Sequence, residues 1–442
     1  MKLDSHVVRS AVAASLGGLL FGFDTAVIAG ATKALTELYH LSENALGFTV
    51  ASALIGTVLG AMFSGVLGDR RGRRGALQFM GVLYIVSAVG CAFSWDWYSL
   101  IFFRFIGGLG IGGSSVLGPM YIAEISPAKV RGRLVGFFQF NVVFGILVAY
   151  CSNYLIGLAG LGDAEWRWKL GVAAFPALVF FLMLLGIPQS PRWLVKRGRV
   201  DEARAVLLKI GEENAEQELA EIVESIDVSH GLGDEPLFRA KYRLPVLLAI
   251  LIGMFNQLSG INAILYYLND IFARAGFDKV SSDLQAVAIG ATNLAAVIVA
   301  MLMIDHLGRK RLLLIGSVGT AICLAGVSAI FYIHQHEALL VWLLVGFIGF
   351  FSFSQGAVIW VYLSEIFPNR VRAKGQSLGS FTHWFMNAAI AWTFPLIAHS
   401  SGGAPFALFS VMMALQFFVV LFVFPETKGL SLEQMQKKLG IH

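Results

Sequence analysis

Long apolar runs recur along the whole chain, and short segments that carry most of the charged residues separate them. A hydrocarbon core about 30 Å thick takes roughly 20 helical residues to cross. The runs do not alternate like strands, and only helices or closed barrels satisfy their own backbone groups in lipid. We therefore predict an all-α membrane protein with twelve transmembrane helices, which begin near residues 10, 46, 75, 98, 132, 168, 244, 283, 311, 337, 375 and 404.

An internal repeat divides these runs into two sets. Residues 121–131 recur as residues 362–372, with Tyr, Glu, Ile, Pro, Val and Arg at matching places. Residues 69–74 recur in a similar way as residues 305–310. Parallel repeats related by an axis along the membrane normal are an architecture of secondary transporters, which bind substrate between their halves. The duplication therefore favours a transporter.

The repeat and the apolar runs together predict four parts along the chain. We expect an N-terminal six-helix bundle at residues 1–190, a cytoplasmic linker with short amphipathic helices at 191–243, a C-terminal six-helix bundle at 244–425, and a cytoplasmic tail at 426–442. The linker is rich in Ala, Glu, Leu, Lys and Arg and contains no catalytic cluster, so a scaffold role is expected for it.

The composition supports a membrane protein and indicates its orientation. Hydrophobic residues make up 57% of the 442 residues, charged residues make up 14%, and the mean hydropathy is +0.72. One soluble core of this size cannot hide so much apolar surface. The basic residues that fall on the side away from the termini are only Lys33, Arg167, Lys169, Arg274 and Lys279.

Basic loops face the cytoplasm, so both termini are expected there, in an inner (plasma) membrane of bacterial type. The net charge of +5 reflects this topology. Because the basic residues are spread between apolar runs and not along one soluble face, no nucleic acid partner is expected.

One carboxylate lies in the middle of a predicted span. Asp24 interrupts the first apolar run, where an ionised group is costly and usually marks an ion path or a proton relay. Arg104, in the fourth run, is its candidate charge partner. A permanent structural ion pair is the alternative, although a buried pair seldom stabilises a protein on balance. The sequence favours a proton-coupling role for Asp24 and Arg104.

Acidic and basic residues repeat at the cytoplasmic ends of the predicted spans. Ion pairs among them would hold that side closed and would break when it opens, as a rocking transporter requires. The alternative is that these charges only fix the topology. The residues that we assign to this cytoplasmic gate are Asp69, Arg73, Glu124, Arg131, Asp305, Arg309, Glu365 and Arg372.

Polar amides recur inside otherwise apolar spans. Amides offer hydrogen-bond donors and acceptors, which suits a neutral polyhydroxyl ligand, and nearby aromatic rings offer apolar faces with a polar edge. Each amide could instead be interhelical glue, a possibility that weighs least for the cluster in the seventh run. The candidate residues for a monosaccharide site are Gln139, Asn256, Gln257, Asn262, Asn293, Trp360, His383, Trp384 and Asn387.

Other patterns are interpreted as structural. Residues 108–113 satisfy the dinucleotide pattern G-x-G-x-x-G, but they lie in a span with no preceding strand, so the small residues are expected to permit close helix contact. His334 and His336 form an H-x-H without further ligands, and the three cysteines are scattered. We therefore expect no metal, no cofactor and no catalytic residues.

Several motifs together resemble the sugar porter family of the major facilitator superfamily over essentially the whole chain. They are residues 68–74 (GDRRGRR), Arg104 with the glycines that follow it, residues 188–194 (PQSPRWL), residues 257–262 (QLSGIN) followed by Tyr266 and Tyr267, and residues 425–429 (PETKG). The resemblance implies a major facilitator fold, with two pseudo-symmetric six-helix bundles, alternating access, and a hexose or pentose substrate. It also implies sugar contacts for Gln139, Gln257, Asn262, Asn293, Trp360, Trp384 and Asn387, with Asn256 and His383 at neighbouring sites.

Three positions bear on the activity that the resemblance implies. Proton symporters of the family carry an aspartate where this chain has Asp24, whereas the facilitators of animal cells typically carry asparagine. Gln189 replaces a glutamate that is usual in the family, so one cytoplasmic ion pair is expected to be missing. Asn256 replaces the first of two glutamines, which predicts a different preferred sugar.

We therefore expect a proton-coupled monosaccharide symporter that functions as a monomer in the lipid bilayer. The main alternative is an uncoupled facilitator in which Asp24 and Arg104 stay paired throughout the cycle. A sugar-binding membrane sensor would signal through the linker, which is short for that task. A membrane enzyme ranks last, because no nucleophile, base and orienting group occur together.

Overall fold

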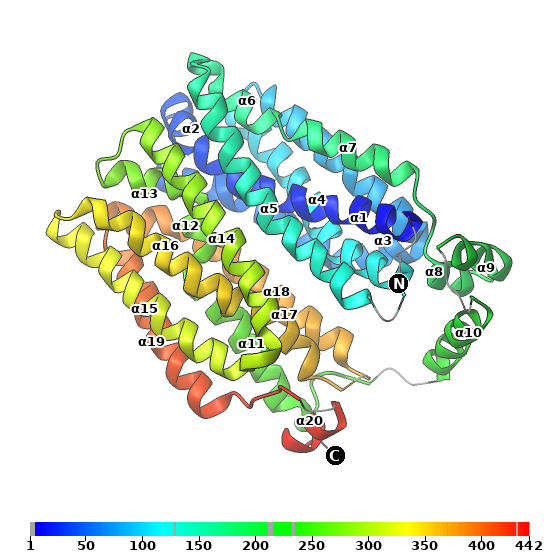
Figure 1. The fold of residues 1–442 in the computed structure, drawn as a ribbon. Helices are drawn as coiled ribbons and strands as arrows, with labels where there is room; N and C mark the ends of the chain where they lie inside the picture. Colours follow the sequence, from blue (N-terminus) through cyan, green and yellow to red (C-terminus); the bar gives the residue numbers. More distant parts are fainter. Residues whose placement is uncertain are drawn as a thin grey trace. The chain divides into compact units, whose positions relative to one another are not determined.

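The computed structural model describes residues 5–127, 130–210, 215–231, 235–368, 370–429 and 432–441, except for the side chains of residues 225–231, 305, 432 and 433. Every regular element in these ranges is a helix (Figure 1). The N-terminal part contains α1 (Ser5–Val27), η1 (Ile28–Gly30), α2 (Thr32–Tyr39), α3 (Glu43–Ala92), α4 (Trp97–Ile125), α5 (Arg131–Leu158), η2 (Gly162–Ala164), α6 (Glu165–Gly171) and α7 (Ala174–Leu185).

The middle of the chain contains short helices and the C-terminal part contains longer ones. The middle helices are α8 (Pro191–Lys196), α9 (Val200–Lys209), α10 (Ala215–Gly231) and η3 (Ala240–Tyr242). The C-terminal helices are α11 (Arg243–Leu258), α12 (Ile261–Tyr266), α13 (Leu268–Arg274), α14 (Lys279–Leu307), α15 (Arg309–Ile333), α16 (Glu337–Phe353), α17 (Gln355–Glu365), α18 (Arg372–Ser400), α19 (Ala404–Val423) and α20 (Leu432–Lys438).

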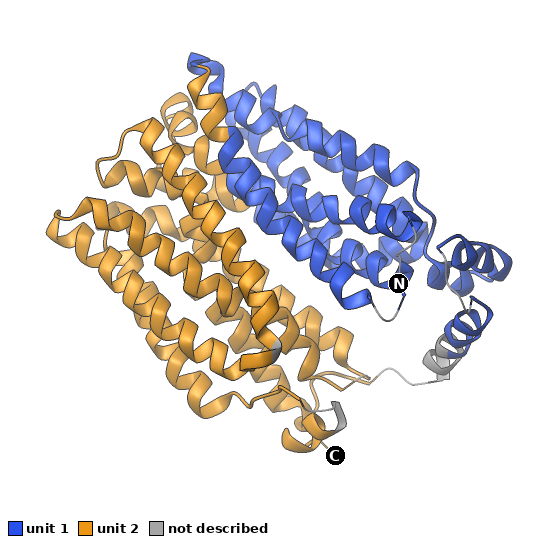
Figure 2. Cartoon of the chain, in the orientation of Figure 1, with its two compact units in different colours: residues 1–27, 52–152, 160–233 blue, residues 28–51, 153–159, 234–442 orange. Residues whose placement is uncertain are grey.

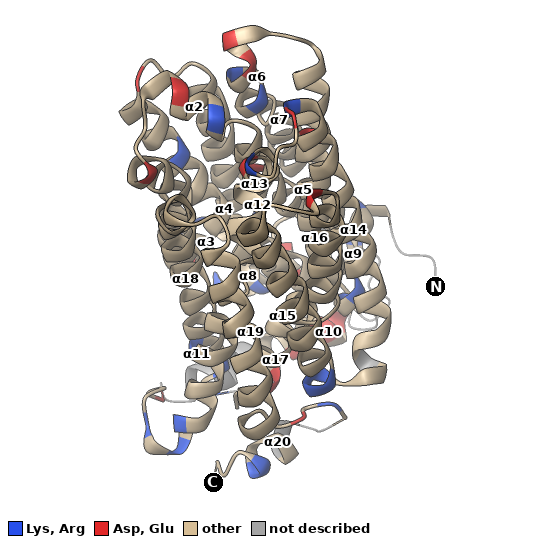
Figure 3. Ribbon diagram, turned by 90° about the vertical axis from the view of Figure 1, so that its left-hand side faces the viewer, with Lys and Arg blue, Asp and Glu red and all other residues tan. Residues whose placement is uncertain are grey.

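Ten helical segments of the described ranges are long and apolar enough to cross a membrane. One of them, α3, has 50 residues and contains Gly72, whose φ of 79° and ψ of 161° are not helical. Because one span needs roughly 20 residues, α3 is long enough for two. The all-α prediction is confirmed, whereas the number of twelve spans stays a prediction. Lys, Arg, Asp and Glu gather near helix ends and leave the middle of most helices apolar (Figure 3).

The chain forms two compact units, which Figure 2 shows in different colours. Unit 1 consists of residues 1–27, 52–152 and 160–233, and unit 2 consists of residues 28–51, 153–159 and 234–442. The chain therefore passes from one unit to the other within α3 and within α5, so these helices belong to both.

In unit 1, α1 packs against α4 and α7, and glycines let helices approach closely. A Cβ at Gly22 would clash with the Val142 carbonyl of α5. Within the G-x-G-x-x-G run, a Cβ at Gly108 would clash with the Ala53 carbonyl, and one at Gly112 with the Thr57 carbonyl, both of α3. These glycines serve close helix packing, as the absence of a preceding strand indicated.

In unit 2, α15 packs against α16 and α19, and α11 packs against α18. Buried Leu312, Ile359, Tyr362 and Phe367 belong to one apolar cluster near one end of these helices. The short helices α8, α9 and α10 of unit 1 share a separate small core that includes Leu194, Leu207 and Leu219. Each unit thus holds its polar side chains on helices that apolar contacts fix in place.

Candidate functional site

Asp24 and Arg104 lie on two helices that pack against each other in unit 1. Helix α1 carries Asp24, and α4 carries Arg104, whose side chain is buried. Arg104 is the charged group that acts on Asp24. The Tyr84 hydroxyl lies 2.8 Å from Ser114 Oγ and is within range of the charge of Asp24. The fold thus brings the two predicted partners together, and their role in coupling stays a prediction.

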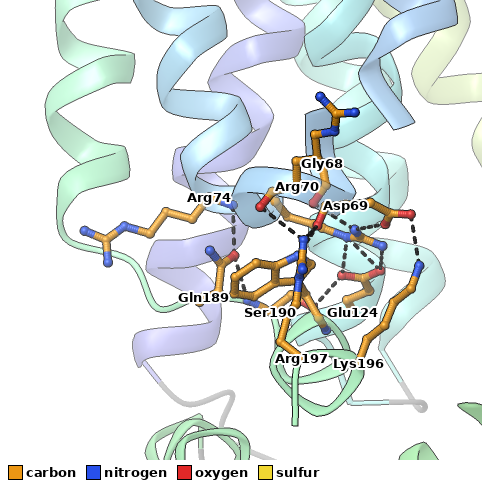
Figure 4. A network of polar contacts seen from close by, with 11 residues as sticks. Gly68, Asp69, Arg70, Arg74, Glu124, Gln189, Ser190, Lys196 and Arg197 are labelled. Atoms are coloured by element: carbon orange, nitrogen blue, oxygen red, sulfur yellow. Dashed lines mark hydrogen bonds and ion pairs between the residues drawn. The ribbon is translucent and has the colours of Figure 1, made fainter. Parts of the chain in front are cut away.

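A polar network joins the end of α4 to the bend of α3 and to α8 in unit 1 (Figure 4). Arg73 lies 2.8 Å from Asp69 Oδ1 and 3.1 Å from Glu124 Oε2. The Ser190 hydroxyl donates to Glu124 Oε2 at 2.5 Å, and Lys196 lies 2.9 Å from Asp69 Oδ2. Three of the predicted gate residues therefore contact one another within unit 1.

Unit 2 repeats this network with different residues. Arg309 lies 2.9 Å from Glu365 Oε1, and the Thr427 hydroxyl donates to Glu365 Oε2 at 2.6 Å. The Tyr362 hydroxyl donates to the Pro425 carbonyl at 3.2 Å. In unit 1, the Tyr121 hydroxyl donates to the Pro188 carbonyl at 2.8 Å in the same way. The segments 188–190 and 425–427 are therefore a third pair of equivalents, which the sequence analysis missed.

Gln189 and Glu426 occupy equivalent places in this third pair. Gln189 Oε1 accepts the backbone N–H of Arg74 at 3.1 Å. Glu426 accepts the backbone N–H groups of Arg309 and Lys310, at 2.9 and 3.1 Å, at the start of α15. Burial alone would raise the pKa of the Glu426 carboxyl, but the backbone N–H groups that it accepts lower its pKa below the usual value.

The remaining gate residues have other partners. Arg131 lies 4.0 Å from Glu218 of α10, and Arg372 donates to the Phe367 carbonyl at 3.3 Å. The side chain of Asp305 lies outside the described residues. The function of these charges as a gate stays a prediction.

The predicted amides of the seventh span meet in unit 2 around Gln257. Its Nε2 donates to Asn256 Oδ1 at 3.1 Å and lies 3.3 Å from the ring nitrogens of His383. Asn262 Nδ2 donates to Gln257 Oε1 at 3.0 Å. Asn256 and Gln257 are buried, so this cluster holds amide groups away from the surface.

Asn387 extends the cluster along α18 and has an unused acceptor. Its Nδ2 donates to the Tyr266 hydroxyl at 3.1 Å, whereas its Oδ1 is buried without a hydrogen-bond partner among the described residues. The His383 ring lies 5.2 Å from the Trp360 ring and 5.0 Å from the Trp384 ring. A buried acceptor without a partner is costly, so a ligand hydroxyl at this point would be stabilising.

A helix break shapes this region. Helix α11 ends at Leu258 and α12 begins at Ile261, because Gly260 has a φ of +80°, a conformation that favours glycine. A Cβ there would also clash with the Phe409 ring. Irregular backbone at membrane depth is tolerated where it is buried in protein or lines a cavity. The break places Asn262 beside Gln257.

Of the other two predicted residues, one has a different partner and the other belongs to unit 1, and two buried amides, Gln355 and Gln416, were missed. Asn293 of α14 accepts from the Ser352 hydroxyl at 2.7 Å. Gln139 belongs to α5 of unit 1 and is partly buried. Gln355 Nε2 donates to Gln416 Oε1 at 2.8 Å, and its backbone carbonyl accepts from Asn256. The only signal for Gln355 in the sequence was a polar residue inside an otherwise apolar run.

The comparisons with known proteins agree with this arrangement. Residues 10–439 match the family described as sugar (and other) transporter. The chain belongs to this family. It is 35% identical to the D-xylose-proton symporter of Escherichia coli K12, with 98% of this chain and 95% of the relative covered. It is 38% identical to the arabinose-proton symporter of Bacillus subtilis, with 98% and 94% covered.

Solved structures show the same fold. The xylose transporter XylE from E. coli, in a partially occluded inward-open conformation, matches with a TM-score of 0.87 and 34% identity. The match covers 97% of this chain and all of that chain. The major facilitator proton:xylose symporter XylE bound to 6-bromo-6-deoxy-D-glucose matches with a TM-score of 0.80 and 34% identity. The predicted family and the predicted fold class are confirmed.

The family also bears on the kind of activity. Its members with these names are membrane transporters, which is consistent with the prediction that the chain is not an enzyme. Among the residues that the structure describes, no group of three or more His, Cys, Asp or Glu side chains could hold a metal ion.

Proposed function

We propose that this protein carries a monosaccharide, a hexose or a pentose, together with a proton by alternating access. The observation that carries the proposal is the buried amide cluster around Gln257, which Asn387 extends with an Oδ1 that bonds to none of the described residues. A sugar hydroxyl can donate to this oxygen, and the rings of Trp360 and Trp384 offer faces for the apolar side of the sugar. Relatives that transport D-xylose and arabinose support the class of substrate.

Asp24 is the proton acceptor in this proposal, and Arg104 is its charge partner. Protonation of Asp24 removes a buried charge, which makes the transition between outward-facing and inward-facing states easier. The names of the proton symporters to which the chain is similar support this role. We also propose that the protein acts as a monomer in the inner membrane, with both termini in the cytoplasm.

The test is transport in proteoliposomes. A symporter accumulates labelled D-xylose or L-arabinose when the outside is made acidic, and it also exchanges labelled sugar for unlabelled sugar without a gradient. An uncoupled facilitator shows exchange without accumulation. If neither sugar is exchanged and a panel of hexoses and pentoses does not compete for binding, the proposed substrate class is wrong.

A further inference from the structure

A cavity of ≈ 350 Å³ lies in unit 2 and is lined in part by residues of α2 and α13. These two helices lie at the end of unit 2 opposite α20 (Figure 1). Helix α2, the start of α3 and helix α13 form its charged wall, and the ends of α15, α18 and α19 form its apolar wall. The charged residues that line it are Lys33, Glu37, Glu43, Asp270 and Arg274. The lining residues from the apolar wall, Phe331, Phe394, Pro395, Ala398, Gly402 and Phe406, carry no charge.

Asp270 is the carboxyl group of this cavity that lacks a full set of partners. It lies on α13, beyond the last span residue Tyr266, and its Oδ2 is buried with no hydrogen-bond partner in the part of the chain that the structure describes. Arg274, one helical turn away, donates to the Ala398 carbonyl at 2.9 Å. An ionised carboxylate held in this way is costly, whereas a protonated carboxyl is neutral.

The charges around Asp270 also favour a proton. Three carboxyl groups and two cations line the cavity, so one bound proton balances the charge. Burial raises the pKa of Asp270 to about 6. The nearby Thr32 hydroxyl and the charges of Arg274 and Lys33 act to lower its pKa, and the charge of Glu43 acts to raise it.

The cavity lies where residues 28–51 pack inside unit 2. Helix η1 contacts α12 and α13. Asn44 accepts from the Trp392 indole at 2.8 Å, and the Phe48 ring lies 5.2 Å from the Trp392 ring. Residues 28–51 follow α1 and continue into the rest of α3, and both of these belong to unit 1. Movement of α1 and of the rest of α3 during alternating access would release this packing.

We propose that Asp270 is a second proton-binding site, distinct from Asp24, and that its protonation stabilises the packing of residues 28–51 on α13 and α18. This inference rests on the proposed transport by alternating access. Release of the packing exposes Asp270 to water, where an aspartate has a pKa of about 4. The packed state therefore gains stability as the pH falls below about 6 and gains no more below about 4.

The experiment measures the packed and released populations by the distance between two spin labels. Leu38→Cys on α2 and Ser400→Cys at the end of α18 carry the labels, in a background that lacks Cys91, Cys151 and Cys323. The measurement runs from pH 7.5 to pH 4.5 without sugar or gradient. We expect the ratio of packed to released protein to rise by up to about tenfold for each pH unit below about 6.

Variants around the cavity assign the response to Asp270. Asp270→Asn should remove the pH response in this range. Glu43→Gln should move the response to lower pH, and Lys33→Ala should move it to higher pH, because these charges act on Asp270 in opposite directions. Glu337→Gln is the matched control, since Glu337 is an exposed carboxylate at the start of α16 outside the lining of this cavity, and it should leave the response unchanged.

Several outcomes would overturn the proposal. A ratio that does not change with pH, or a response that persists in Asp270→Asn, excludes Asp270. If Asp270→Asn does not fold, the other two variants test the proposal. A pH response that does not move in opposite directions in Glu43→Gln and Lys33→Ala would exclude Asp270. A response lost in Asp24→Asn would assign the proton to Asp24. No sugar is present in the spin-label experiment, so its result does not depend on symport. A failed transport assay would therefore not contradict the role of Asp270, and a failed spin-label experiment would not contradict the proposed transport.

Discussion

At the scale of single residues, the buried polar groups of this protein fall into two kinds. Some form a hydrogen bond within their own helix, such as the Ser317 hydroxyl, which donates to the Leu313 carbonyl at 2.7 Å. Others, such as Asn387 Oδ1, have no partner within the described structure. Only the second kind represents a free-energy cost that a ligand can remove, so these atoms are the best guide to the site.

Asp24→Asn keeps the size and polarity of the side chain but removes the ionisable group. We expect accumulation driven by a proton gradient to be lost, while exchange of labelled sugar without a gradient is largely retained. Proteoliposome assays of both activities on the same preparation measure this. If the variant still concentrates sugar in response to the gradient, another residue carries the proton.

Asn387→Ala removes the acceptor that we assign to a sugar hydroxyl. We expect sugar binding to weaken by about 1 to 3 kcal/mol, since a buried hydroxyl of the ligand would lose its partner. Calorimetry on purified protein measures the affinity. Ser317→Ala, also buried in unit 2, is the control and should bind as the wild type does. Equal affinities of the two variants would remove Asn387 from the site.

Sequence predicts which residues of the site are unusual, but not how they meet. Asp24 and the amides of the seventh span are visible because they are polar inside apolar runs. The bond from Asn256 to the Gln355 carbonyl joins positions 99 residues apart, and no local pattern encodes it. Gln416 was missed for the same reason, because its partner Gln355 lies on another helix.

At the scale of elements, helix ends and helix breaks position the polar groups. The break at Gly260 and the bend at Gly72 both depend on positive φ angles. The sequence shows these glycines but not their φ values, and 48 glycines occur in the chain. Most of them are equally consistent with small residues that allow close helix packing. The sequence therefore did not distinguish the two glycines at the helix breaks from the others.

Gly260→Ala should destabilise the protein, because alanine is strained at a φ of +80° and its Cβ would clash with Phe409. We expect a loss of at least about 1 kcal/mol, read as a lower melting temperature in detergent. Gly349→Ala is the control, since nothing lies within 4 Å of a Cβ there and α16 is a regular helix. A neutral result at both positions would show that the break tolerates a side chain.

The start of α15 gives a prediction with a defined pH dependence. The lowered pKa of Glu426 means that its charge stabilises the folded protein above about pH 4.5, and this contribution is lost as the pH falls through the lowered pKa. Glu426→Gln should therefore lower stability by about 0.3–1 kcal/mol at pH 7, and less at pH 4. Melting temperatures at both pH values measure this.

Gln189 allows the reverse test at the equivalent place in unit 1. Gln189→Glu adds an anionic acceptor for the backbone N–H of Arg74 and should raise the melting temperature at pH 7. The gain should be smaller at pH 4, which lies near the ordinary pKa of a glutamate carboxyl, about 4.3. An increase that is equal at both pH values would mean that charge is not the cause.

At the scale of the whole molecule, the sequence repeat is a repeat of interactions. Arg73 with Glu124 and Arg309 with Glu365 are equivalent pairs in the two halves of the sequence. The repeat at residues 121–131 and 362–372 could be seen because several residues match. The equivalence of Gln189 and Glu426 could not be predicted from the sequence, because segments 188–190 and 425–427 have only their proline in common.

Glu365→Gln tests whether these pairs control access from the side of the termini. The variant replaces a charge-assisted contact to Arg309 by a weaker one, while Thr427 keeps an acceptor. We expect the resting population to shift toward the state that is open to the cytoplasm. A shift of about 1.4 kcal/mol changes the equilibrium about tenfold, and sugar added from outside then binds with weaker apparent affinity.

Cysteines placed at helix ends on the side of the termini report this shift, in a background that lacks Cys91, Cys151 and Cys323. We expect faster reaction of Glu365→Gln with an impermeant thiol reagent applied from that side. Glu337→Gln is the control, because Glu337 is exposed at the start of α16 and pairs with no residue of this network. Unchanged labelling together with unchanged affinity from outside would mean that these charges fix the topology, since a gate that loses an ion pair must change its populations.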